Sequence, residues 1–169
     1  SSGLVLGGPG KIDIIKMDDK IGSLLKRNNI SGDHNIIFGH TRLITNGLTD
    51  NQPIIYSDAI VVHNGIIINH EEVFKSCESE PRFQIDTEAI NILVKNGLQQ
   101  DKSLSVIAQE ILGTIIGTIS ICVLLPKLNK VLLLSNNGSL YTSYRGKKLF
   151  FASEYSALVK IGCSEIEQL

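Results

Sequence analysis

Short runs of apolar residues, many of them β-branched, alternate along this sequence with polar segments rich in Gly, Asn and Asp. Apolar runs bounded by such turn residues predict strands, and apolar residues at helical spacing predict amphipathic helices. Because the strands follow one another through short turns while the helices are grouped, the pattern favours an α+β fold over a doubly wound parallel sheet. We expect strands at residues 4–6, 11–17, 35–38, 114–125, 130–134, 139–144 and 147–152, and helices at about 19–27, 69–75, 87–96, 103–112 and 153–160. The continuous apolar run Val131–Leu134 further predicts a strand buried on both faces.

The stretch from Ala59 to His70 contains two β-branched runs on either side of Asn64-Gly65. Asn-Gly supplies the positive φ values of a type I′ turn, so the local pattern predicts a tight β-hairpin with its turn at these two residues. The same pair would also present an amide side chain and an unhindered backbone N–H, which are the donors of an oxyanion hole. On this pattern alone the hairpin is the favoured interpretation, since Asn-Gly turns are common and oxyanion holes are rare.

Composition narrows the class of protein. The 169 residues are 43% hydrophobic and 20% charged with a net charge of −1, which is typical of one soluble globular domain. The near-neutral charge argues against nucleic acid and anionic lipid as partners, and the apolar run Thr118–Leu125 is too short to span a membrane. Cys77, Cys122 and Cys163 show neither disulfide nor zinc spacing, which favours reduced thiols and a cytoplasmic location.

Two charged residues are candidates for binding a small molecule. Arg42 follows a predicted buried strand, and its guanidinium would match a carboxylate in bidentate fashion. Taken alone, a structural ion pair or a solvated loop arginine is the favoured interpretation. Asp86 precedes a predicted helix that Gly97 would close; it would serve as an N-cap or hold an ammonium group. Together with Asn64 and Gly65, these residues would hold an α-amino acid whose side-chain carbonyl is attacked by a nucleophile.

No metal or cofactor is expected. His40, His63 and His70 have no carboxylate or thiolate beside them at ligand spacing, so hydrogen-bonding roles are favoured for these histidines.

Five motifs in order carry a family resemblance: Gly39-His40-Thr41-Arg42, Thr45-Asn46-Gly47, Asn51-Gln52-Pro53, His63 to His70, and Asp86-Thr87-Glu88. Together they resemble the class II glutamine amidotransferase, or glutaminase, domain of the N-terminal nucleophile hydrolases. The resemblance covers residues 1–169, and the stretch from His63 to Glu71 is most similar to the glutaminase half of glutamine–fructose-6-phosphate aminotransferases.

The resemblance implies a four-layer αββα sandwich of two antiparallel sheets. It implies hydrolysis of L-glutamine to glutamate and ammonia. The ammonia would pass to an acceptor, a sugar phosphate, that is bound by a synthase or isomerase domain or subunit. A homo-oligomer is a possible assembly. By motif position, Arg42 would bind the glutamine α-carboxylate and Asp86 its α-ammonium. Thr45 and Asn46 would line the pocket, and Asn64 with the Gly65 N–H would form the oxyanion hole.

Two departures from the family pattern leave alternatives open. The family nucleophile is an N-terminal cysteine, and no cysteine of this chain matches it. We expect the strand that carries it to lie upstream of Ser1; a glutamine-binding module without activity is the alternative. Leu43 and Asn46 stand where sugar-phosphate aminotransferases usually have Trp and His. Leu43 and Phe150–Glu154 look more like asparagine synthetases, which makes another acceptor the second alternative.

Overall fold

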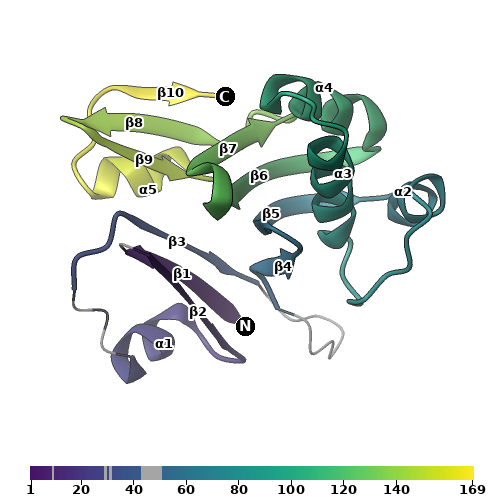
Figure 1. Cartoon of the computed structure of the whole chain (residues 1–169). Coiled ribbons are helices and arrows are strands. Elements are labelled where there is room, and N and C mark those ends of the chain that lie inside the picture. Colours follow the sequence, from purple (N-terminus) through teal and green to yellow (C-terminus); the bar gives the residue numbers. More distant parts are fainter. Residues whose placement is uncertain (9, 29, 31, 43–50) are drawn as a thin grey trace.

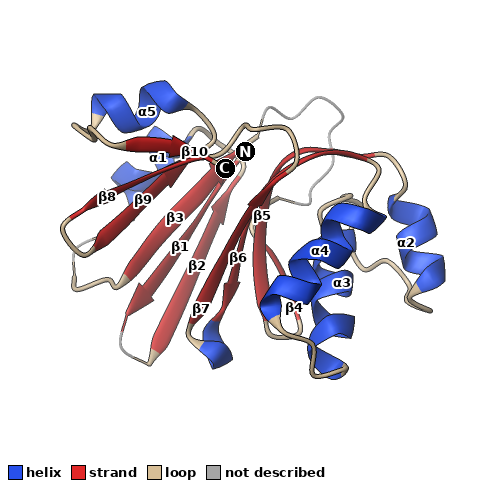
Figure 2. Cartoon of the chain, turned by 90° about the horizontal axis from the view of Figure 1, so that it is seen from above, coloured by secondary structure: helices blue, strands red, loops and turns tan. Residues whose placement is uncertain are grey.

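The chain folds into four layers, with two β layers packed face to face and helices on both outer surfaces (Figures 1 and 2). The structure is a computed structural model that describes residues 1–8, 10–28, 30, 32–42 and 51–169. The strands are β1 (Ser2–Gly8), β2 (Lys11–Met17), β3 (Ile36–Thr41), β4 (Ile54–Tyr56), β5 (Ala59–Ile67), β6 (Gly117–Leu125), β7 (Lys130–Ser135), β8 (Tyr141–Arg145), β9 (Lys148–Ala152) and β10 (Ile166–Gln168). The helices are α1 (Ile21–Arg27), α2 (His70–Ser76), α3 (Glu88–Gln99), α4 (Leu104–Thr114) and α5 (Tyr155–Lys160), with a 3-10 turn at Pro126–Leu128.

One β layer is a four-stranded antiparallel sheet in the order β4-β5-β6-β7. The other layer contains the antiparallel sheets β2-β1-β3 and β10-β8-β9, which lie side by side in both views (Figures 1 and 2). Helices α2, α3 and α4 cover the outer face of the four-stranded sheet, while α1 and α5 lie over the opposite layer (Figure 1). The predicted α+β class and αββα layering are confirmed; among the described residues, one layer consists of two separate sheets instead of one.

Alternation along β5 divides the hydrophobic core in two. Ala59 and Val61 point to the helices and join the cluster around Ile90, Ile107 and Ile119. Ile60 and Val62 point to the opposite β layer and pack with Val5, Phe38 and Cys122. Both clusters follow from the two-residue period of a strand whose faces are both covered.

The hairpin predicted at Asn64-Gly65 is wrong. These residues lie inside the continuous strand β5, with Asn64 opposite Ser120 and Gly65 opposite Ile119 of β6. A nearby hairpin joins β4 to β5 at Ser57-Asp58, where Ser57 has φ +54°. The β-branched residues on both sides of Asn64-Gly65 therefore extend one strand through the pair.

Two smaller predictions have mixed outcomes. Val131–Leu134 belongs to β7, where Leu132 and Leu134 pack against the core cluster under the helices and Leu133 packs against the cluster between the β layers. Both faces of the strand are therefore covered as predicted, although these side chains are only partly buried and Val131 is 38% exposed. Gly97 does not end its helix, since α3 continues to Gln99. It lies instead against α4, where a Cβ on Gly97 would meet Ile107 Cγ1 at 2.5 Å. Among the described residues no helix is long and apolar enough to cross a membrane.

Candidate functional site

A cleft of about 770 Å³ opens between the end of β3, the second half of β5, the start of α2 and the loop before α3. It brings together four of the six site residues predicted from the sequence: Arg42, Asn64, Gly65 and Asp86. Thr45 and Asn46, the other two, lie outside the described residues. Residues that are up to 44 positions apart in sequence (42 to 86) therefore share one cavity, as binding of a single small molecule requires.

The floor of the cleft is the stretch of β5 around Gly65. Gly65 has φ +144°, and a Cβ there would lie 1.9 Å from the carbonyl oxygen of Thr118 and 2.8 Å from His63 Nε2. Strand β6 thus approaches the backbone so closely that only glycine fits. Gly65 and its neighbour Asn64 are both exposed and both line the cleft.

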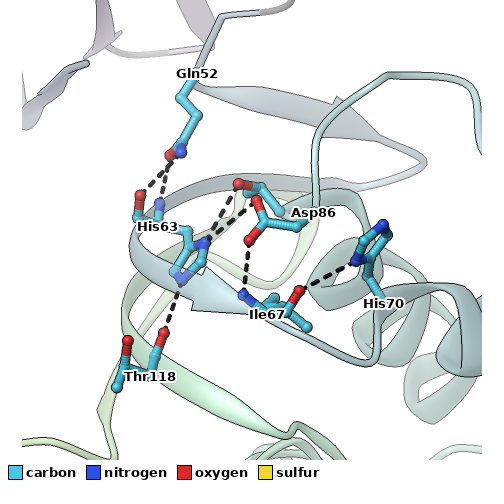
Figure 3. A network of polar contacts seen from close by, with 7 residues as sticks. Gln52, His63, Ile67, His70, Asp86 and Thr118 are labelled. Atoms are coloured by element: carbon cyan, nitrogen blue, oxygen red, sulfur yellow. Dashed lines mark hydrogen bonds and ion pairs between the residues drawn. The ribbon is translucent and has the colours of Figure 1, made fainter. Parts of the chain in front are cut away.

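Just before this floor, the side chain of Gln52 holds the backbone of His63 (Figure 3). Its Nε2 donates to the His63 carbonyl oxygen at 2.9 Å, and its Oε1 accepts from the His63 N–H. Gln52 is 4% exposed. The buried amide therefore satisfies both backbone groups of His63 and fixes the strand where it enters the cleft.

The ring of His63 lies between β6 and the start of α3 (Figure 3). Its Nε2 is 3.2 Å from the Thr118 carbonyl oxygen, and its Nδ1 is 3.4 Å from Thr87 Oγ1 and 4.0 Å from Asp86 Oδ1. Burial lowers the pKa of His63 below its ordinary value, against the opposing effects of the Asp86 charge and the Thr118 carbonyl. Burial of the ring therefore favours its neutral form.

Asp86 does not cap α3. The helix begins at Glu88 with Thr87 in the N-cap position, and no side chain caps it there. Asp86 Oδ2 instead accepts from the backbone N–H of Ile67 at 2.8 Å, across the cleft floor. Its side chain keeps 26% of its surface exposed, so the carboxylate faces the cleft with one oxygen anchored to β5.

Arg42 provides the opposite charge in the same cleft. It directly follows β3, and its backbone N–H donates to the carbonyl oxygen of Ser1, which continues the β1–β3 pairing. The neighbouring His40 has its pKa lowered to about 4, first by burial and then by its electrostatic interactions with His63 and Arg42. His40 is therefore neutral at pH 7. The charged groups that the cleft presents to a ligand are the Arg42 guanidinium and the Asp86 carboxylate.

Glu88 has a role that the sequence did not reveal. Its carboxylate is fully buried and accepts from the backbone N–H groups of Arg82 (2.9 and 3.2 Å) and Phe83 (2.9 Å). These bonds hold the loop whose residues Pro81, Phe83 and Gln84 line the cleft. The sequence offers only one indication of a role for Glu88, its position in the first turn of a predicted helix after Asp86-Thr87. An acidic residue at that position predicts a favourable interaction with the helix dipole and does not predict bonds to a loop.

None of the three cysteines lines the cleft. All three are free thiols; Cys122 lies in the core between the β layers, where burial raises its pKa to about 12, and Cys163 is also buried. Cys77 follows the end of α2 and is partly buried. The described cleft therefore contains binding groups and no thiol nucleophile.

Parts of this chain are similar in sequence to known proteins. Residues 40–160 match the model of a protein family described as a glutamine amidotransferase domain. The chain is 30% identical over 168 residues to glutamine–fructose-6-phosphate aminotransferase [isomerizing] of Brucella abortus, covering 94% of this chain and 27% of that protein. The enzyme of the same name from Halobacterium salinarum is 24% identical over 167 residues, covering 95% of this chain and 28% of that protein. The chain thus spans less than a third of the length of these curated relatives.

Solved structures show the same fold. Glutamine phosphoribosylpyrophosphate amidotransferase from B. subtilis, described as complexed with ADP and GMP, superposes with a TM-score of 0.81 at 20% identity. The match covers 99% of this chain and 38% of that chain. A structure described as the allosteric regulatory enzyme of purine biosynthesis also gives a TM-score of 0.81, at 19% identity.

Proposed function

The chain belongs to the family of glutamine amidotransferase domains, and from that membership we propose that residues 1–169 form a glutaminase domain. It hydrolyses L-glutamine to glutamate and ammonia and delivers the ammonia to an acceptor domain or subunit. The observation that carries the proposal is the shared cleft of Arg42, Asp86 and the Asn64-Gly65 floor. A cation, an anion and an oxyanion site in one cavity match the three polar ends of glutamine.

In the proposed complex, Arg42 binds the α-carboxylate and Asp86 Oδ1 the α-ammonium, while Thr45 and Asn46 line the pocket. The side-chain carbonyl then lies over Asn64 and Gly65. Attack by a thiolate on the carbonyl carbon produces a tetrahedral oxyanion, which the Asn64 amide and the Gly65 N–H stabilise. The C–N bond breaks as the nitrogen takes a proton and leaves as ammonia, and water hydrolyses the thioester to release glutamate and the thiol.

The thiol in this scheme belongs to a cysteine outside residues 1–169, because Cys77, Cys122 and Cys163 do not line the cleft. We propose an N-terminal cysteine whose own α-amino group is the general base, on a strand that precedes Ser1. A glutamine-binding module without hydrolysis is the second candidate, and the same observation about the cysteines favours it.

A sugar phosphate is the proposed acceptor, as the names of the curated relatives suggest. The sequence at Leu43 and Phe150–Glu154 supports an asparagine synthetase-like acceptor as the alternative. Incorporation of ammonia by the full-length protein, measured first with a sugar phosphate and then with the acceptor of asparagine synthetases, distinguishes these two proposals. The free thiols support a cytoplasmic location.

Steady-state release of glutamate from glutamine by the full-length protein tests the proposal. Asn64→Ala is expected to lower kcat about 100-fold with a small change in KM, because its amide acts on the oxyanion. Asp86→Asn is expected to raise KM, since it removes the charge that faces the ammonium group. Asp58→Asn is the matched control: that carboxylate pairs with Lys127 outside the cleft, and its loss should change neither constant.

Three results would decide between the candidates. Glutamate release that depends on Asn64 supports the glutaminase. Calorimetric binding of glutamine without any glutamate release supports the non-catalytic module. Neither binding nor hydrolysis by the full-length protein would refute both.

A further inference from the structure

His63 contacts both halves of the proposed glutamine site although neither ring nitrogen faces a predicted substrate group. The side chain is 1% exposed, and the Gln52 amide holds the backbone of the same residue on both its N–H and its carbonyl. The ring is therefore fixed in position between Thr118 of β6 on one side and Asp86 on the other (Figure 3), with Thr87 Oγ1 also 3.4 Å from Nδ1.

The contact with β6 determines where the ring carries its hydrogen. Nε2 lies 3.2 Å from the carbonyl oxygen of Thr118, and a carbonyl oxygen only accepts hydrogen bonds. Nε2 must therefore donate. The same Thr118 oxygen lies 1.9 Å from the position that a Cβ on Gly65 would take, so the His63 bond fixes the carbonyl against which the cleft floor rests.

The other nitrogen follows from the first. A neutral ring with hydrogen on Nε2 has a lone pair on Nδ1, which can accept from the buried Thr87 hydroxyl 3.4 Å away. Nδ1 then has no hydrogen to give to Asp86 Oδ1, 4.0 Å away. Since Oδ2 is bonded to the Ile67 N–H, Oδ1 is the oxygen that we assign to the substrate.

We propose that His63 is a positioning residue of the glutamine site, a role that rests on the proposed function. As the neutral Nε2–H tautomer, it fixes the oxyanion-binding backbone through Thr118. Through Nδ1, which lies within 4.0 Å of both Thr87 Oγ1 and Asp86 Oδ1, it accepts the hydrogen of the Thr87 hydroxyl and keeps it from the carboxylate, which leaves Asp86 Oδ1 for the substrate ammonium group. One ring thereby sets the relative position of the two sites that bind opposite ends of glutamine.

Two conservative substitutions separate the two nitrogens. The amide of His63→Gln reaches the place of Nε2 and keeps the donor to Thr118, but it leaves the Thr87 hydroxyl to Asp86. The amide of His63→Asn reaches the place of Nδ1 and keeps an acceptor for Thr87, but it leaves Thr118 without a donor. Each variant therefore removes one proposed contact and keeps the other.

Glutamine kinetics of the full-length protein should then show a crossed pattern. His63→Gln is expected to raise KM about tenfold with little change in kcat, and His63→Asn to lower kcat about tenfold with little change in KM. Thr87→Val, which removes the competing hydroxyl together with its bond to the ring, should leave KM close to that of the wild type. A general loss of packing would move both constants in the same direction in both His63 variants, and that result would overturn the proposal.

Nitrogen-15 chemical shifts of the His63 ring in the wild-type protein at pH 7 provide a test that needs no variant to fold. The neutral Nε2–H tautomer is expected, and an Nδ1–H tautomer or a charged ring would overturn the proposal. If the wild type hydrolyses glutamine and both His63 variants match it, only the role of His63 is refuted. If the wild type neither binds nor hydrolyses glutamine, the proposed function fails and the role of His63 fails with it.

Discussion

Replacement of Gly65 by alanine tests directly whether the cleft floor acts in catalysis. The new Cβ would lie 1.9 Å from the Thr118 carbonyl oxygen, whereas a close carbon–oxygen contact is about 3.3 Å, so the two strands must separate by about 1.4 Å. The residue would also keep a φ of +144°, which L-residues rarely adopt. Overpacking of this kind costs about 1–3 kcal/mol of stability. Displacement of a positioned donor by about 1 Å costs about 100-fold in rate.

We therefore expect Gly65→Ala to lower kcat for glutamine hydrolysis about 100-fold and to lower the free energy of unfolding by about 2 kcal/mol. Steady-state glutamate release and urea unfolding measure the two effects on the same preparation. Gly113→Ala is the matched control, because no heavy atom lies within 4 Å of its Cβ position in α4. It should stabilise the protein by about 0.5–1 kcal/mol and leave kcat unchanged. A Gly65→Ala protein with wild-type kcat would refute the role of the floor.

Three further predictions concern the surroundings of the site. Gly97→Ala should lower the urea midpoint by an amount equivalent to about 1–3 kcal/mol, because its Cβ would lie 2.5 Å from Ile107 Cγ1; an unchanged midpoint would show that α3 and α4 separate freely. Glu88→Gln should cost about 2 kcal/mol in urea unfolding and raise KM, since the bonds to Arg82 and Phe83 weaken; a cost in stability with no change in KM would show that the loop does not shape the cleft. Burial lowers the pKa of His40 from 6.5 to about 4, so between pH 6.5 and pH 4 His40 is protonated in the unfolded state and neutral in the folded state. The free energy of unfolding therefore falls as the pH falls through this range. Urea unfolding should show a loss of about 2 kcal/mol from His40 between pH 7 and pH 5, absent in His40→Asn; equal slopes in the two proteins would contradict it.

The sequence predicted most elements because their signals are local. Ser103, for example, caps α4 through its hydroxyl, which accepts from the Val106 N–H, as the sequence indicates. The error at Asn64-Gly65 has a physical cause: an Asn-Gly pair has the same local pattern in a type I′ turn and in a strand that another strand approaches closely. Only the partner strand β6 distinguishes the two, and its residues follow about fifty positions later.

Only the site residues that belong to sequence motifs were predicted. Arg42, Asn64, Gly65 and Asp86 were identified from motif positions, and the structure places them in one cleft; their chemical roles remain predictions. The supporting contacts were not predicted, because a buried amide such as Gln52 and a buried carboxylate such as Glu88 find their partners only after the chain has folded. Side-chain bonds to distant backbone groups leave no periodic signal in a sequence.

The pairing of β5 with β6 also determines when the cleft can form. Ile67 lies opposite Gly117, and α2, α3 and α4 occupy the intervening residues 68–116. Closing a loop of this length costs about 1.4 kcal/mol more than closing one of ten residues. Helices form within about a microsecond, so the helical segment is expected to fold before the two strands meet. On a ribosome, β4 can pair with the first residues of β5, but residues 62–67 have no partner strand until β6 has emerged. A partly synthesised chain therefore lacks a complete floor for the proposed glutamine site.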